Sequence, residues 1–128
     1  MVNKIPHGTY TLALQGQMVV CDYAGSFNLA GVEALIRDVL ALTQHLPRWV
    51  LFQRPEPSAA VTFDAVEPMM NGYLAFQQAG CLAVAIVERS FFVHAGKPYR
   101  PAALTLEIRI KPDEDELLLW LQEQLHVK

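Results

Sequence analysis

Two apolar runs decide the fold of this chain, Trp49-Val50-Leu51-Phe52 and Leu82-Ala83-Val84-Ala85-Ile86-Val87. Neither run alternates between apolar and polar residues, which is typical of parallel strands in a sheet that helices cover on both faces. Pro47 precedes the first run and Gly80 precedes the second, and each marks the end of a preceding helix. The sequence therefore predicts an α/β fold.

The residues before the first run predict a hairpin and a helix. Weak alternation over residues 9–14 and 17–23, with a Gln-Gly pair between them, is typical of a β-hairpin. Ser26 or Asn28 can cap a helix over residues 29–46, whose apolar side chains recur at helical spacing. The chain is thus expected to begin with an antiparallel pair of strands and to continue in βα units.

A second helix is expected between the two apolar runs. Asp64 is its predicted cap, Glu67 is the capping-box partner three residues later, and Gly80 follows the last turn. Asn71-Gly72 lies inside this helix and weakens the pattern, because glycine is a poor helix former and the pair favours a turn.

The last third of the chain predicts a strand and a final helix. Apolar and polar residues alternate over residues 104–110, which predicts an edge strand with Glu107 and Arg109 on a face exposed to water. Asp113 and Glu116 then form a capping-box pattern ahead of a helix. With the earlier elements this gives a mostly parallel five-stranded sheet with about four helices, in a single domain over residues 1–128.

Composition and charge narrow the class of protein. The chain has 128 residues, of which 52% are apolar, but no run is long enough for a membrane span. The net charge is −3 and the basic residues are scattered, so a nucleic-acid partner is not expected. The first eight residues lack a signal-peptide core, so the expected location is cytoplasmic. Alternation in the first and last strands, with the high apolar content, predicts a homodimer.

The two cysteines are expected to be free thiols. Cys21 lies near the end of one predicted strand and Cys81 at the start of another, which places the sulfurs too far apart for a disulfide. No basic neighbour activates either thiol, so each is expected to be a small buried apolar residue.

Polar residues follow three of the predicted strands, at the sheet edge where open α/β sheets bind ligands. The candidate binding residues on this strand-end face are Asp22, Tyr23, Asn28, Arg54, Glu56, Ser58, Glu88, Arg89, Ser90 and His94. The simpler reading is that Ser26 and Asn28 cap one helix and Ser90 caps a short one. The charged residues Arg54, Glu56, Glu88 and Arg89 then form solvated ion pairs.

No pattern in the sequence predicts catalysis, a metal or a cofactor. The four histidines are far apart in the chain, the glycines are scattered singly, and no serine or cysteine lies in a nucleophile motif. The one compact basic feature is the loop over residues 94–100, which could hold an anionic group or be a solvated connection. The protein is therefore expected not to be an enzyme.

The order of elements and the Leu-Gln-Gly-Gln hairpin resemble the STAS, SpoIIAA-like family of anti-sigma-factor antagonists and their uncharacterised bacterial relatives. The resemblance spans roughly residues 8–125 and implies a regulatory module that binds a partner protein. Phosphorylated members carry an Asp-Ser-small-Gly motif after the strand that corresponds to Trp49-Val50-Leu51-Phe52. Here that loop reads Arg54-Pro55-Glu56-Pro57-Ser58-Ala59-Ala60, so the motif is absent and a kinase-controlled switch is not expected.

The resemblance also leaves a second function open. The related CRAL-TRIO lipid-transfer fold implies an apolar pocket, and a carrier could hold a small apolar ligand between helix and sheet. The side chains expected to line such a pocket are Met69, Met70, Tyr73, Phe76 and the Phe91-Phe92 pair. At helical spacing the same residues are also what an ordinary core contains.

Overall fold

A computed structural model describes residues 5–126 of the protein. The expectation about the first eight residues therefore falls partly outside the described chain. In chain order the elements are β1 (Thr9–Gln15), β2 (Met18–Ala24), β3 (Ser26–Phe27), α1 (Leu29–Leu42), β4 (Trp49–Pro55), β5 (Ala60–Val61), α2 (Phe63–Gln78), β6 (Cys81–Val87), the 3₁₀ helices η1 (Phe91–His94) and η2 (Lys97–Tyr99), β7 (Glu107–Lys111) and α3 (Glu114–His126).

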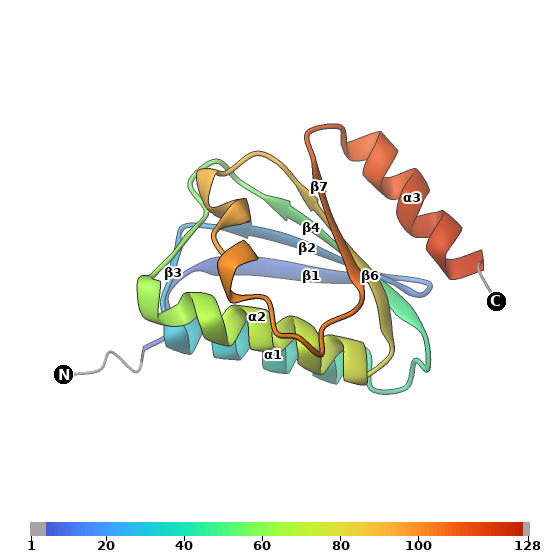
Figure 1. Ribbon diagram of the computed structural model, residues 1–128, viewed down its shortest axis with the longest axis horizontal. Coiled ribbons are helices and arrows are strands. Elements are labelled where there is room, and N and C mark those ends of the chain that lie inside the picture. Colours follow the sequence, from blue (N-terminus) through green and yellow to red (C-terminus); the bar gives the residue numbers. More distant parts are fainter. Residues whose placement is uncertain (1–4, 127–128) are drawn as a thin grey trace.

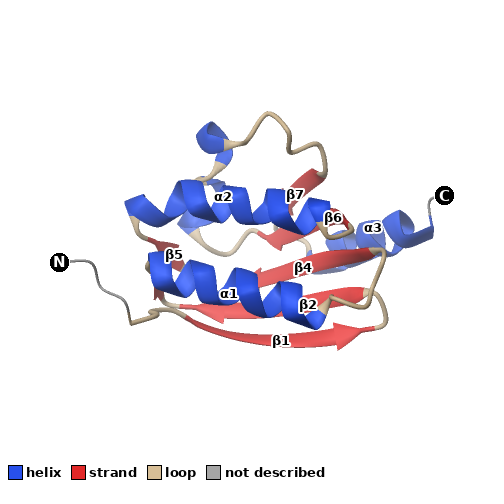
Figure 2. Ribbon diagram, turned by 90° about the horizontal axis from the view of Figure 1, so that it is seen from below, coloured by secondary structure: helices blue, strands red, loops and turns tan. Residues whose placement is uncertain are grey.

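These elements form three layers around one five-stranded sheet. The strand order is β1-β2-β4-β6-β7, with β1 antiparallel to β2 and the other neighbours parallel. Helices α1 and α2 lie side by side on one face, and α3 covers the other (Figures 1 and 2). The predicted α/β class, hairpin and mostly parallel five-stranded sheet are confirmed. A short parallel pair, β3 with β5, was not predicted.

The two apolar runs are the central strands and have buried side chains on both faces. In β4, Trp49 and Leu51 face α1 and α2, while Val50 and Phe52 face α3. In β6, Val84 and Ala85 divide between the two faces in the same way, and both are fully buried. Continuous apolar sequence is therefore required here, because neither face of these strands meets water.

Asn28 begins α1. Its side-chain oxygen accepts hydrogen bonds from the backbone N–H of Gly31 (2.8 Å) and of His7 (2.9 Å). Ser26, the other predicted cap, lies in β3. The helix ends at Leu42 and not near residue 46, because the hydroxyl of Thr43 donates to the carbonyl of Val39 and the chain then turns.

Helix α2 begins at Phe63, with Thr62 as the N-cap, so the prediction of Asp64 as the cap was wrong. Asp64 lies in the first turn, where its carboxylate accepts a hydrogen bond from the Thr62 hydroxyl (2.6 Å). The helix continues through Gly72. A Cβ at this position would collide with the side chain of Ile36 on α1. Glycine at this position lets α1 and α2 approach closely, which outweighs its poor helix propensity.

The predicted strand over residues 104–110 forms only in its second half. Leu104 and Leu106 are buried but lie in a loop ahead of β7. The side chain of Gln77 accepts from the backbone N–H of Leu106 (3.0 Å), and Arg100 donates to the carbonyls of Leu104 (3.0 Å) and Leu106 (2.5 Å). Side chains thus satisfy the backbone groups that a sheet ladder would otherwise pair.

Helix α3 changes the environment of β7. Asp113 caps it, as predicted, by accepting from the backbone N–H of Glu116 (3.1 Å). The helix packs back on the sheet through Leu117, Trp120 and Leu121. The guanidinium of Arg109 lies 4.2 Å from the centre of the Trp120 ring. Arg109, predicted to face water, is therefore partly covered by α3, while Glu107 is exposed as predicted and β7 is the edge strand that the alternation predicted.

Candidate functional site

The strand-end face contains a network of four charged side chains. Arg54 at the end of β4 binds Asp22 of β2 through two hydrogen bonds of 2.6 Å and 2.8 Å, because the parallel register places these residues opposite each other. Arg54 also reaches Glu114 of α3 (3.4 Å), and Arg89 reaches the same carboxylate (2.6 Å). The hydrogen bond with Asp22 raises the pKa of Arg54.

This network fastens the start of α3 to the ends of β4 and β6. The predicted partners of the two arginines, Glu56 and Glu88, were wrong, since the acids in contact with them are Asp22 and Glu114. Such partly exposed pairs stabilise a protein by about 1 kcal/mol or less each. The network explains the position of α3 more directly than it explains binding.

Three of the remaining polar candidates have local side-chain contacts, namely Glu88, Ser90 and His94. Glu88 lies 2.5 Å from the Nε2 of His94. The hydroxyl of buried Ser90 donates to the carbonyl of Ala59 and accepts from the backbone N–H of Phe92 (3.2 Å), which caps η1 as predicted. These side chains do not join the Arg54 network in one constellation.

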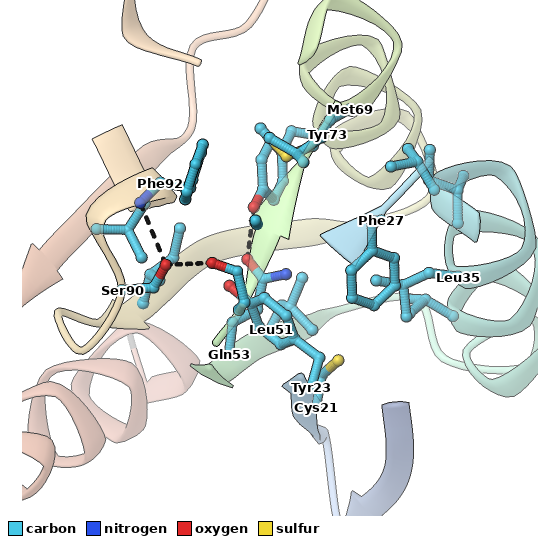
Figure 3. A pocket seen from close by; sticks show the side chains of 18 of the residues that line it. Cys21, Tyr23, Phe27, Leu35, Leu51, Gln53, Met69, Tyr73, Ser90 and Phe92 are labelled. Carbon is cyan, nitrogen blue, oxygen red and sulfur yellow. Dashed lines mark hydrogen bonds between the residues drawn. The ribbon is translucent and has the colours of Figure 1, made fainter. Parts of the chain in front are cut away.

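An apolar cavity lies beneath these residues, between α1, α2, η1 and the sheet. It has a volume of about 80 Å³ and opens to the solvent. Figure 3 shows Phe92 on one side, Phe27 and Leu35 on the opposite side, and Met69 above. Tyr23 is the one member of the predicted strand-end face besides Ser90 that lines it, and burial raises its pKa well above the usual value.

The polar groups inside this cavity are paired with one another. The hydroxyl of Tyr73 on α2 donates to the side-chain oxygen of Gln53 on β4 (2.5 Å), and both residues are buried (Figure 3). Burial raises the pKa of Tyr73, so its hydroxyl is protonated at neutral pH. Cys21 also lines the cavity as a free thiol, and burial raises its pKa from 9.0 to about 12.

A second cavity of about 160 Å³ adjoins the first. Four residues line both, namely Met69, Tyr73, Ile86 and Val93. The outer part of the second cavity is formed by η2, the following loop and β7, and it includes Lys97, Arg100, Ile108 and Ile110. The two spaces therefore share part of their walls.

The side chains predicted to line a pocket divide between these spaces. Met69, Tyr73, Phe76 and Phe92 line the first cavity and Met70 lines the second, whereas Phe91 is 98% exposed and lines neither. Gln53 was missed, although a polar residue directly after the run Trp49-Val50-Leu51-Phe52 was the available signal. Among the described residues, no group of His, Cys, Asp and Glu is placed to hold a metal ion.

Comparison with known proteins identifies the fold. No family model and no curated protein matches the chain. The structure is similar to that of an uncharacterised protein of the DUF3478 family from Shewanella loihica PV-4, which is described as having a SpoIIAA-like fold. The two share 12% sequence identity over 94% of this chain and 98% of the other, with a TM-score of 0.61. The fold is SpoIIAA-like.

At this level of identity the likeness concerns the fold, and it confirms the architecture that the order of elements implied. In this SpoIIAA-like fold, Ser58 is exposed in the loop between β4 and β5, ahead of the first residue of α2, Phe63. Its hydroxyl accepts a hydrogen bond from the backbone N–H of Gly25 (3.2 Å). Within residues 5–126, no helix is both long and apolar enough to cross a membrane.

Proposed function

We propose that this protein is a non-enzymatic binding module of the SpoIIAA-like type that holds a small apolar ligand between its helices and its sheet. The observation that carries the proposal is the apolar cavity beneath the strand-end face. It combines an open mouth, aromatic and aliphatic walls and few polar groups, which is the usual composition of a small-molecule site.

Polar side chains that line the cavity already have hydrogen-bond partners, which supports ligand binding rather than catalysis. Tyr73 and Gln53 satisfy each other inside the cavity, and Ser90 is engaged by the backbone on both sides. A catalytic site needs a base or nucleophile aimed at the reacting atom. The thiol of Cys21, with its raised pKa, is a poor nucleophile at neutral pH.

The sequence alone favours protein interaction over a carrier, and the cavity reverses that order. Protein interaction is the second candidate, because several large apolar side chains lie exposed at the same end of the fold. Phe91 is 98% exposed, Phe63 is 84% exposed and Phe92 is 47% exposed. Exposed aromatic side chains of this kind are typical of surfaces that bind another protein. Homodimer formation and a cytoplasmic location stay predictions.

Native mass spectrometry of the full chain, purified from its own host, tests the carrier function. We expect a mass excess of one small molecule that is lost on denaturation. Val93→Trp should abolish this excess, because Val93 lines both cavities and the larger ring fills them. The matched control is Leu119→Trp, a 58% exposed position on α3, which should retain the ligand.

The alternative outcomes are distinct. A wild-type chain with no small molecule, and no change in its NMR spectrum on addition of 1-octanol, would contradict the carrier function. A stoichiometric polypeptide that is lost in Phe91→Ser, with Leu119→Ser as control, would favour the protein-interaction function instead.

A further inference from the structure

We infer that the ligand is an amphipathic anion, whose apolar chain occupies the two adjoining cavities and whose acidic headgroup lies at Lys97 and Arg100. This inference rests on the proposed function, because it names the ligand class of the same site. Its basis is the distribution of charge around the cavities and the way in which they connect.

The cavities together offer an elongated apolar space. One is about 80 Å³ and the other about 160 Å³, and Met69, Tyr73, Ile86 and Val93 line both. Met69 is unbranched and only partly buried, so a change in its side-chain rotamer can open one space to the other. A dry cavity of about 150 Å³ is large enough to bind benzene, so the larger space can accept a comparable apolar group.

The charged side chains that line these spaces all have the same sign. They are Lys97 and Arg100, both at the second cavity, and no acidic residue among residues 5–126 lines either one. This contrasts with the net charge of −3 for the whole chain. An apolar chamber with cations at one end matches a molecule that has a hydrocarbon body and one negative charge.

The two cations differ in how they are held. Arg100 is fixed by hydrogen bonds from one guanidinium nitrogen to the carbonyls of Leu104 (3.0 Å) and Leu106 (2.5 Å). Lys97 is exposed, and within the described part of the chain it has no hydrogen-bond or ion-pair partner. The ammonium group of Lys97 is therefore available to an incoming anion, beside a guanidinium that is already positioned.

The opposite end of the space sets the orientation of the ligand. Tyr73, which lines both spaces, and its partner Gln53 form a neutral, mutually hydrogen-bonded pair. The walls beyond it are apolar and include Phe27, Leu35 and Val39. Burial of an unpaired charge in such surroundings is costly. The headgroup must then lie at η2, with the chain directed past Tyr73 toward α1.

Three probes with the same eight-carbon chain test the inference on the full-length protein: octanoate, 1-octanol and octylamine. Binding is measured by NMR titration, with shifts expected for residues 93–110. We expect octanoate to bind at least about 5-fold more tightly than 1-octanol, and octylamine to bind most weakly. Lys97→Gln should weaken the binding of octanoate by about 5-fold and leave the affinity for 1-octanol unchanged.

Two further variants sharpen the test. Lys97→Glu should reverse the preference, so that octylamine binds more tightly than octanoate. Lys111→Gln is the matched control, because Lys111 is exposed at the end of β7 and lines neither cavity, and it should leave all three affinities unchanged. Melting temperatures equal to that of the wild type establish that the variants are folded.

The possible failures are separable. Equal affinity for octanoate and 1-octanol, unaffected by Lys97→Gln, would overturn the acidic headgroup and leave apolar binding intact. Absence of binding by all three probes would overturn both the headgroup and the proposed function.

Discussion

Replacing Tyr73 by phenylalanine should destabilise the protein by about 1–3 kcal/mol, because it leaves the buried side chain of Gln53 without a partner. Tyr73 is 5% exposed and Gln53 is 6% exposed, and their hydrogen bond of 2.5 Å joins α2 to β4. The cost arises less from the lost bond than from the polar amide that stays behind in an apolar cavity.

The second step is the double variant Tyr73→Phe/Gln53→Leu. Removing both partners eliminates the unpaired group, so the double variant should be more stable than Tyr73→Phe alone and within about 1 kcal/mol of the wild type. Tyr99→Phe is the control, since Tyr99 is 39% exposed, and it should change stability by less than about 0.5 kcal/mol.

Urea unfolding followed by tryptophan fluorescence measures these differences. With an m-value of about 2 kcal/mol/M, a loss of 2 kcal/mol lowers the midpoint by about 1 M. If Tyr73→Phe shifts the midpoint no more than Tyr99→Phe does, the side chain of Gln53 is not left unpaired, and the assignment of the Tyr73–Gln53 pair as a stabilising buried hydrogen bond is refuted.

Three further results are expected. Ala85→Asp should unfold the protein, with a loss above about 4 kcal/mol in a thermal or urea melt, because Ala85 is fully buried in a central strand; a melt like that of the wild type would contradict this placement. Arg109→Ala should cost about 0.5–1 kcal/mol through loss of its contact with the α3 tryptophan, whereas Glu107→Ala should cost less than about 0.5 kcal/mol; equal effects would mean that the ring contact contributes nothing. Burial raises the pKa of Cys21 and Cys81 from 9.0 to about 12, so both thiols ionise first in the unfolded chain. Their contribution to stability is complete below about pH 9, and urea melts should show stability falling between pH 9 and 12. Stability that rises over this range would exclude the assigned burial.

Much of the fold follows from local pattern, because its main elements have strong and separate signals. The hairpin around Gly16, the helix capped by Asn28, the two central strands and the helix capped by Asp113 are all read correctly from spacing and caps. In each case the residues that determine the element lie within the element or directly beside it.

The errors occur where a distant segment decides the outcome. Alternation at Leu104 and Leu106 has the period of a strand, but Gln77 and Arg100 satisfy the backbone there and hold a loop. Arg109 has the spacing of an exposed residue, yet α3 returns over it. Sequence spacing carries no information on such contacts, because they depend on where the chain lies after folding.

The candidate site was predicted only in part, for the same reason. The strand ends were correctly expected to gather polar residues, but the ion-pair partners of Arg54 and Arg89 come from β2 and α3. The cavity depends on how α1, α2 and η1 close over the sheet, and an apolar residue that lines a space cannot be distinguished by sequence from one that fills it.

The main sheet is assembled strictly in the order of the chain, since each strand pairs with the preceding strand of that sheet. During synthesis a new strand can therefore add to an edge that already exists, without waiting for a distant segment. The helix that covers the second face is translated after all five strands of the sheet, and it supplies Leu117, Trp120 and Leu121 against that face. Until residues 113–126 emerge from the ribosome, that face of the sheet has no helix to cover it, and exposed apolar surface of this kind is prone to aggregation.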